Sequence, residues 1–253
     1  MIKLSTIEKN IGYPEEWPDN SRDYEVTDNL LENIIKISKI DTEKSIENII
    51  AHKDYWGFSV LDVNAYYNPQ DNSINFPAAV LEYELYSKDN SYYENLGSLG
   101  MVIGHEISHS FDSNGALFDE KGNLNNWWKD EDFEKFKELQ KEVIAYYNKY
   151  KINGKLTVGE NIADLGGLSC VVEIAKNKGA SNEELKELFE AYAHIWASKC
   201  TDEYLTLTSL DTHAPDKIRV NAVLSAIDQF YEVYNITEED EMFKPEDERP
   251  KIW

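Results

Sequence analysis

The sequence predicts an α+β protein that is mainly α-helical and carries one small β element. Apolar residues recur at helical spacing over most of the chain after residue 96. Before that, β-branched and aromatic residues gather over 60–67, turn-forming residues follow over 68–72, and Ile74-Asn75-Phe76 returns as the second arm of a hairpin. The chain has 253 residues, 42% of them hydrophobic, and no low-complexity linker. We therefore expect a single domain over residues 1–253.

The elements before residue 96 follow from turn and capping signals. Residues 1–26 contain Pro14 and Pro18 and are expected to be irregular. Thr27 or Asp28 is expected to cap a first helix, and a second short helix is expected after Asp41. A strand over 60–67 and the returning arm, ended by Pro77, complete this half.

The sequence from Leu96 onward predicts helices separated by short breaks. In order, these are a helix from Leu96 to Phe111, a loop over 112–128 with Trp127-Trp128 as a buried anchor, a long amphipathic helix capped by Asp130, a break over 151–155, a helix from Val158 to Lys176, a helix begun by the capping box Ser181–Glu184, a helix from Thr201 to about Leu210, a last main helix opened by Pro215, and an exposed tail over 238–251.

Composition narrows the class of protein. The net charge of −23 argues against nucleic-acid binding, because phosphates would be repelled. No stretch reaches the ~18 apolar residues that span a bilayer, and the first residues lack the apolar core of a signal peptide. Cys170 and Cys200 are expected to be buried free thiols, as in a reducing compartment. A cytoplasmic location is the expectation, with a secreted or cell-surface parent protein as the alternative.

The motif with the clearest chemistry is His105-Glu106-Ile107-Ser108-His109, which lies in an apolar helical pattern. Residues four apart project from one face of a helix, so His105 and His109 can bind one tetrahedral zinc ion at about 2.0–2.1 Å each. Glu106 can then reach a water at the ion's open position and act as general base. A chance match on a solvated helix is the alternative, and we prefer the metal site.

Two histidines leave such a site one protein ligand short. Glu160 and Asp164 are four residues apart on one predicted helical face, and can supply a third ligand and a carboxylate that orients a zinc histidine. By spacing alone, two ordinary surface acids are the preferred interpretation, because the chain has 48 acidic residues.

Four motifs in this order resemble the neprilysin family of zinc metallopeptidases (M13). They are Val63-Asn64-Ala65-Tyr66-Tyr67, the segment Val102–His109, the segment Gly159–Gly167, and Asp211-Thr212-His213 followed by Arg219, with Ile252-Trp253 at the end. Within that family the chain is most similar to the bacterial oligoendopeptidase O type, from Ile11 onward. The resemblance implies a gluzincin fold with a thermolysin-like catalytic domain.

The resemblance also implies residue roles at the metal. One zinc ion per chain is expected on His105, His109 and Glu160, with Glu106 as general base. Asp164 matches a family aspartate described either as orienting a zinc histidine or as a proton donor. Its place one turn from a ligand favours the orienting role. Asp112 either orients the other histidine or is an ordinary acid at the helix end.

Around the metal, the resemblance implies residues that act on the substrate. His213 matches a donor to the negative oxygen formed during amide hydrolysis, and Asp211 can keep it oriented. Further matches are Arg219 for a substrate carbonyl or carboxylate, Asn64 and Ala65 for the substrate backbone, and Val80, Met101, Val102 and Trp196 for an apolar pocket on the carboxyl side of the cut bond. His52 and His194 match no family position; His52 is expected to be exposed, and His194 to lie on a helix face.

The sequence thus predicts a zinc metalloendopeptidase that prefers an apolar residue after the cut bond. The alternatives are a zinc-binding but inactive fragment and a peptide-binding module that needs a further lobe. The presence of Glu106 argues against the module, whereas the inactive fragment stays open. A zinc aminopeptidase is a lesser alternative, since no acidic motif for a free amino terminus is found. Family members carry a long amino-terminal lobe over the site that this sequence does not match. We therefore expect an open site, an exposed apolar face that takes such a lobe or self-associates, and activity about 10²-fold below a two-lobed relative.

Overall fold

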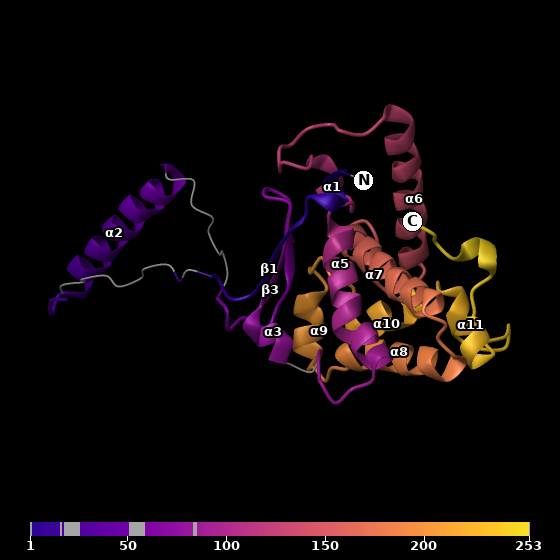
Figure 1. Cartoon of the computed structure of the whole chain (residues 1–253). Helices are drawn as coiled ribbons and strands as arrows, with labels where there is room; N and C mark the ends of the chain where they lie inside the picture. Colours follow the sequence, from indigo (N-terminus) through magenta and orange to yellow (C-terminus); the bar gives the residue numbers. More distant parts are fainter. Residues whose placement is uncertain (1, 16, 18–25, 51–58, 83–84, 253) are drawn as a thin grey trace.

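The computed structural model describes residues 2–15, 17, 26–50, 59–82 and 85–252. A small sheet lies beside a bundle of helices, and one long helix, α2 (Leu30–Ile50), stands apart from both (Figure 1). The predicted α+β class, mainly helical with a small β element, is confirmed.

The sheet has three strands in the order β1-β3-β2. They are β1 (Glu8–Gly12), β2 (Tyr66–Asn68) and β3 (Ser73–Pro77). The predicted hairpin is confirmed, because β2 and β3 pair antiparallel, but its first strand covers only the end of the expected 60–67. The expectation that residues 1–26 are irregular is wrong: the helical turn α1 (Ile2–Ser5) and β1 lie there. The sequence of β1 lacks an alternating pattern, and its strand conformation comes from parallel pairing with the distant β3.

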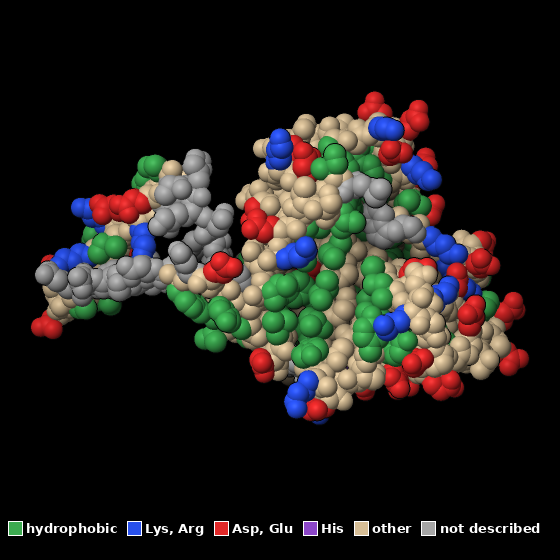
Figure 2. Space-filling model, viewed as in Figure 1, with side chains coloured by type: hydrophobic (Ala, Val, Ile, Leu, Met, Phe, Trp, Pro, Cys, Tyr) green, Lys and Arg blue, Asp and Glu red, His purple; other side chains and the backbone are tan. Residues whose placement is uncertain are grey.

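The predicted pair of short helices is one continuous helix, α2. Asn29 Oδ1 accepts from the backbone N–H groups of Leu31 and Glu32, so Asn29 caps the helix in place of Thr27 or Asp28. No break occurs after Asp41, and Ser45 Oγ donates within the helix to the Asp41 carbonyl. Its leucines and isoleucines are largely exposed, and hydrophobic side chains are visible on this helix and across the front of the body (Figure 2).

The remaining helices follow the predicted order closely. They are α3 (Ala78–Glu82), α4 (Tyr92–Asn95), a π-helical turn (Leu96–Gly100), α5 (Met101–His109), a 3-10 turn (Gly115–Leu117), α6 (Asp130–Asn148), α7 (Val158–Asn177), α8 (Asn182–Ile195), α9 (Asp202–Thr208), α10 (Asp216–Leu224), α11 (Asp228–Tyr234) and a 3-10 turn (Glu246–Glu248). Asp130 is the first residue of α6 rather than its cap. The Ser181 capping box is present, and α11 was not expected because a single helix was assigned to this region.

Helix α7 lies at the centre of the core and packs directly on α5. The contact is between two glycines: a Cβ on Gly104 would lie 3.0 Å from the Gly167 Cα. A Cβ on Gly167 would lie 2.8 Å from the His105 backbone nitrogen. Because no side chain intervenes, the two backbones approach closely enough for residues of both helices to share one site.

The two cysteines and the tryptophan pair are less buried than the sequence predicts. Cys170 and Cys200 are free but exposed, which corrects the expected burial; Cys170 lies one turn before the half-exposed Ile174, on the outer face of α7. Trp127 and Trp128 are only half-buried, and both indole N–H groups donate to the Ala116 carbonyl. His194 lies in α8, as expected of a helix-face residue, and is exposed, and His52 lies outside the described residues. No helix in the described part of the chain is both long and apolar enough to cross a bilayer.

Candidate metal centre

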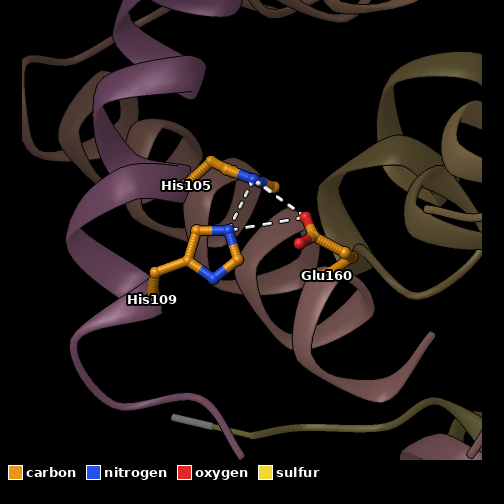
Figure 3. Close-up of side chains that lie close together, drawn as sticks. All are labelled: His105, His109 and Glu160. Carbon is orange, nitrogen blue, oxygen red and sulfur yellow. Dashed lines mark hydrogen bonds and ion pairs between the residues drawn. The ribbon is translucent and has the colours of Figure 1, made fainter. Parts of the chain in front are cut away.

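Three side chains from two helices converge at the α5–α7 contact (Figure 3). His105 and His109 project from α5, and Glu160 projects from the first turn of α7. The two Nε2 atoms are 3.0 Å apart. Each lies 3.4 Å from Glu160 Oε2. The sequence spacing of the histidines therefore brings both rings to one point, and the packing of α7 adds the carboxylate.

These distances fit a tetrahedral zinc ion. Zinc bonds of about 2.0–2.1 Å place neighbouring tetrahedral ligand atoms about 3.3–3.4 Å apart. Glu160 Oε2 is buried and has no well-aligned hydrogen-bond donor, although imidazole nitrogens surround it. Burial raises the pKa of Glu160, but the facing histidines outweigh it and hold this pKa well below its ordinary value. An anionic oxygen and two imidazoles arranged in this way form a suitable donor set for zinc.

Each histidine has a carboxylate behind it. His105 Nδ1 lies 2.8 Å from Asp164 Oδ1, and His109 Nδ1 lies 2.6 Å from Asp112 Oδ2. Burial lowers the pKa of both imidazoles, but these carboxylates and Glu160 outweigh it, so both pKa values lie above the ordinary value. A carboxylate at Nδ1 fixes the tautomer in which Nε2 is free to bind a metal.

Asp164 is held in turn by Arg219. The Arg219 Nε and Nη2 atoms donate to the two carboxylate oxygens at 2.7 and 2.6 Å. The guanidinium lies over the Trp196 ring, 3.6 Å from its centroid. Burial raises the pKa of Asp164, but Arg219 and His105 outweigh it and lower the pKa to about 2. Two donors of Arg219, expected to contact substrate, are thus committed to Asp164, and Trp196 stacks on the same guanidinium.

Glu106 lies on α5 between the two histidines and is 5% exposed. Burial and the charge of Glu160 raise its pKa, whereas the two histidines and the backbone N–H of Tyr67, which faces the carboxylate, oppose this rise. The pKa nonetheless stays above the ordinary value, which suits a general base that works near neutral pH. Tyr67 belongs to the edge strand β2, so the sheet contacts the metal centre directly.

His213 lies on the open side of the site, in the loop between α9 and α10. Its Nε2 is 3.1 Å from Glu160 Oε2. Its Nδ1 is 2.8 Å from Asp211 Oδ1, which also accepts from the His213 backbone N–H. The contact with Glu160 raises the pKa of this imidazole above its ordinary value. The side chain is half-exposed, so it faces both the centre and the solvent.

The residues that were expected to contact substrate lie in different parts of the fold and differ in burial. Asn64 is exposed and Ala65 half-buried, just before the edge strand β2. Val80 and Val102 belong to the small core under the sheet, whereas Met101 is fully buried in the main core. The structure thus brings Val80 and Val102 together and puts Met101 in the other cluster.

Sequence reasoning missed Lys3. Its side chain is 2% exposed, and Nζ donates to the carbonyls of Gly115 and Phe118. Burial lowers the pKa of Lys3 to about 8, although Asp112 and Asp119 raise it. No local signal marks this residue, because its burial depends on a loop more than a hundred residues away.

The sequence of this chain is similar to those of known peptidases. The model of Peptidase family M13 matches residues 64–249. The neutral endopeptidase of Lactococcus lactis subsp. lactis is 42% identical over 260 residues, covering 99% of this chain and 41% of that protein.

Two solved structures have the same fold over nearly the whole chain. The crystal structure of PepO from Lactobacillus rhamnosis has a TM-score of 0.86 at 35% identity, covering 98% of this chain and 41% of that one. The zinc metalloprotease Zmp1 of Mycobacterium tuberculosis, in complex with an inhibitor, has a TM-score of 0.88 at 32% identity, covering 100% of this chain and 42% of that one. The chain thus spans about two fifths of the length of these relatives.

Proposed function

Since the chain belongs to peptidase family M13, as its sequence motifs predicted, we propose that it is a zinc-dependent endopeptidase that hydrolyses peptide substrates. The observation that carries the proposal is the triangle of His105 Nε2, His109 Nε2 and Glu160 Oε2, with sides of 3.0, 3.4 and 3.4 Å. One zinc ion per chain fits this triangle and leaves a fourth tetrahedral position open.

The residues around the triangle divide the chemistry of hydrolysis between them. Zinc, when bound, supplies Lewis-acid chemistry that polarises the substrate carbonyl and lowers the pKa of water. Glu106, buried and with a raised pKa, takes the proton from the attacking water and passes it to the leaving amine. His213, oriented by Asp211 at Nδ1, donates from Nε2 to the developing oxyanion.

Asp164 and Asp112 act by positioning the ligands. Each lies at the Nδ1 of one histidine, where it fixes the direction of Nε2. The bidentate contact from Arg219 holds Asp164 ionised, which favours this positioning role over proton donation.

The substrate is proposed to bind as an extended peptide along β2, whose outer edge is unpaired within the described sheet. We assign to Asn64 and Ala65, just before β2, the hydrogen bonds to the substrate backbone; their position beside this edge supports the assignment. Val102 and Trp196 are partly exposed, and we assign them to a pocket for an apolar residue on the carboxyl side of the cut bond. Val80 and Met101, also expected there, are only 3% and 0% exposed, so in this structure they support the pocket from behind rather than line it. Cleavage mapping with a mixed peptide library checks this preference, and cleavage before Asp or Lys would contradict it.

The activity is tested with a fluorogenic peptide and metal analysis on the same preparations. Wild type is expected to hold one zinc per chain and to lose cleavage in a chelator. Glu106→Gln should keep the zinc and lose at least ~10²-fold in kcat, the scale of a lost acid–base group. Glu160→Ala should lose the zinc, because it removes a ligand.

The variants also separate this proposal from a zinc-binding module without catalysis. A wild type that binds zinc but cleaves no peptide would favour the module. Equal zinc retention by wild type and Glu160→Ala would contradict the site itself. Unchanged kcat in Glu106→Gln would remove the general base from the mechanism.

A further inference from the structure

Lys3, on the short helix α1, is a buried cation at the edge of the metal centre. Its Nζ donates to the Gly115 carbonyl at 2.6 Å and to the Phe118 carbonyl at 2.7 Å. The rings of Tyr67, Phe111 and Trp127 surround it, with centroids 5.6–5.9 Å from Nζ. Burying an ammonium group costs free energy unless it is paired, so moving Lys3 Nζ away from these carbonyls and rings is unfavourable.

One path leads from Lys3 to a metal ligand through the loop after α5. Gly115, whose carbonyl Lys3 holds, donates its own N–H to Asp112 Oδ1 at 2.6 Å. This bond turns the other oxygen, Oδ2, toward His109 Nδ1 at 2.6 Å. Gly115 also lies directly on the end of α5, since a Cβ there would be 1.9 Å from the His109 carbonyl oxygen. Lys3 therefore secures the loop at the point where it sets the position of Asp112.

A second path leads from the same residue to Glu106. The Lys3 carbonyl accepts from Asn72 Nδ2 at 3.0 Å, and Asn72 Oδ1 accepts from the Tyr67 hydroxyl at 2.9 Å. The backbone N–H of Tyr67 in turn faces the Glu106 carboxylate and favours its charged form. Asn72 is fully buried and holds a left-handed conformation, with φ of 53°, which asparagine adopts more readily than most residues.

We propose that Lys3 is a positioning residue of the metal centre. It acts on His109 through the loop that carries Asp112, and on Glu106 through the hairpin that carries Tyr67. The inference rests on the proposed function, because it concerns how well the same site binds zinc and cleaves peptide. It assigns to α1, which lies outside the motifs of the family, a direct effect on the centre.

The test measures zinc affinity by competition with a chromophoric chelator. Lys3→Met keeps the length and apolar volume of the side chain and removes the charge and donors. Its zinc dissociation constant should rise by about tenfold, the lower end of the ~10–100-fold range for residues that orient metal ligands. Lys9→Met, on the exposed side of β1, is the matched control and should bind zinc like wild type. Thermal unfolding of the metal-free chains establishes that each variant is folded.

A double-mutant cycle with Asp112→Asn separates positioning from general support. If Lys3 acts through Asp112, Lys3→Met should weaken zinc binding by less than about twofold in the Asp112→Asn background. The same tenfold loss in both backgrounds, or no loss in folded Lys3→Met, would overturn the proposal. If Lys3→Met does not fold, Lys3→Gln, which keeps a donor on a shorter side chain, replaces it in the double-mutant cycle. The same two results, a loss that disappears in the Asp112→Asn background or an equal or absent loss, then support or overturn the proposal. A wild type without zinc or cleavage would instead refute the proposed function, so the two failures are distinguishable.

Discussion

Replacement of Gly167 by alanine tests whether the α5–α7 contact sets the geometry of the metal centre. The added Cβ would lie 2.8 Å from the His105 nitrogen, 2.9 Å from the Met101 oxygen and 3.1 Å from the His105 Cα. Comfortable contacts between such atoms are about 3.5–4.0 Å. All three atoms are backbone, so α5 must move away from α7 by several tenths of an ångström. This movement carries His105 away from Glu160.

Gly167→Ala is expected to lower both the folding stability of the metal-free chain and its zinc affinity. Overpacking of this kind costs about 1–3 kcal/mol, and the better helix propensity of alanine returns about 1 kcal/mol. The metal-free chain should lose about 1 kcal/mol of stability, which lowers Tm by about 2–4 °C in a chain of this size. Because His105 and Glu160 are held by different helices, the zinc dissociation constant should rise by about tenfold, as for a displaced ligand support.

The assays are a thermal melt of the metal-free chain and chelator competition for zinc. Gly100→Ala is the matched control: its Cβ would meet the flexible Leu96 Cδ1 at 3.0 Å and no backbone atom nearer than the Asn95 oxygen at 3.5 Å. Gly100→Ala should therefore bind zinc like wild type. A Gly167→Ala chain with wild-type Tm and zinc affinity would refute the claim that the glycine contact positions the ligands.

Three further predictions concern the same site. His213→Ala should lower kcat by ~10²-fold with little change in KM, and a raised KM at normal kcat would show that it only binds substrate. Zinc uptake at pH 7 should release more than one proton per chain, because His105 and His109 have raised pKa values in the metal-free chain. Two histidines with ordinary pKa values near 6.5 would release only about 0.5 proton in total. Calorimetry in buffers of different ionisation enthalpy counts the released protons, and the zinc affinity should rise with pH. Asp164, whose pKa is lowered from 3.8 to about 2, stabilises the folded chain above pH 4, and this stability of about 2 kcal/mol should be lost as pH falls through 2. Urea unfolding should show a smaller acid loss in Asp164→Asn.

The histidine pair was predictable because its two members lie within one turn of one helix. Their convergence needs only the periodicity of α5. Glu160 was different: its spacing to Asp164 could not tell a ligand from a surface acid, and only its motif and the packing of α7 identify it. The capping box at Ser181 was equally local and equally predictable.

The features that escaped prediction depend on distant parts of the chain. The strand β1 forms because β3 lies beside it, and its own residues carry no alternation. Lys3 is buried because the loop after α5 folds over it. Arg219 has a bidentate fork suited to a substrate carboxylate, yet in the fold Asp164 is the carboxylate that it meets. The contact with Asp164 was not expected, and the contact of Arg219 with substrate stays a prediction.

The division of the ligands between α5 and α7 makes a bound zinc ion a cross-link between two helices of the core. Any ligand that binds only the folded chain adds RT ln(1 + [L]/Kd), about 4 kcal/mol at a thousandfold excess over Kd. If the proposed zinc site is filled in this way, part of the lifetime of the chain is set by the free zinc in its surroundings. We then expect the core of the metal-free chain to open more often where zinc is scarce, and proteolysis to remove that form first.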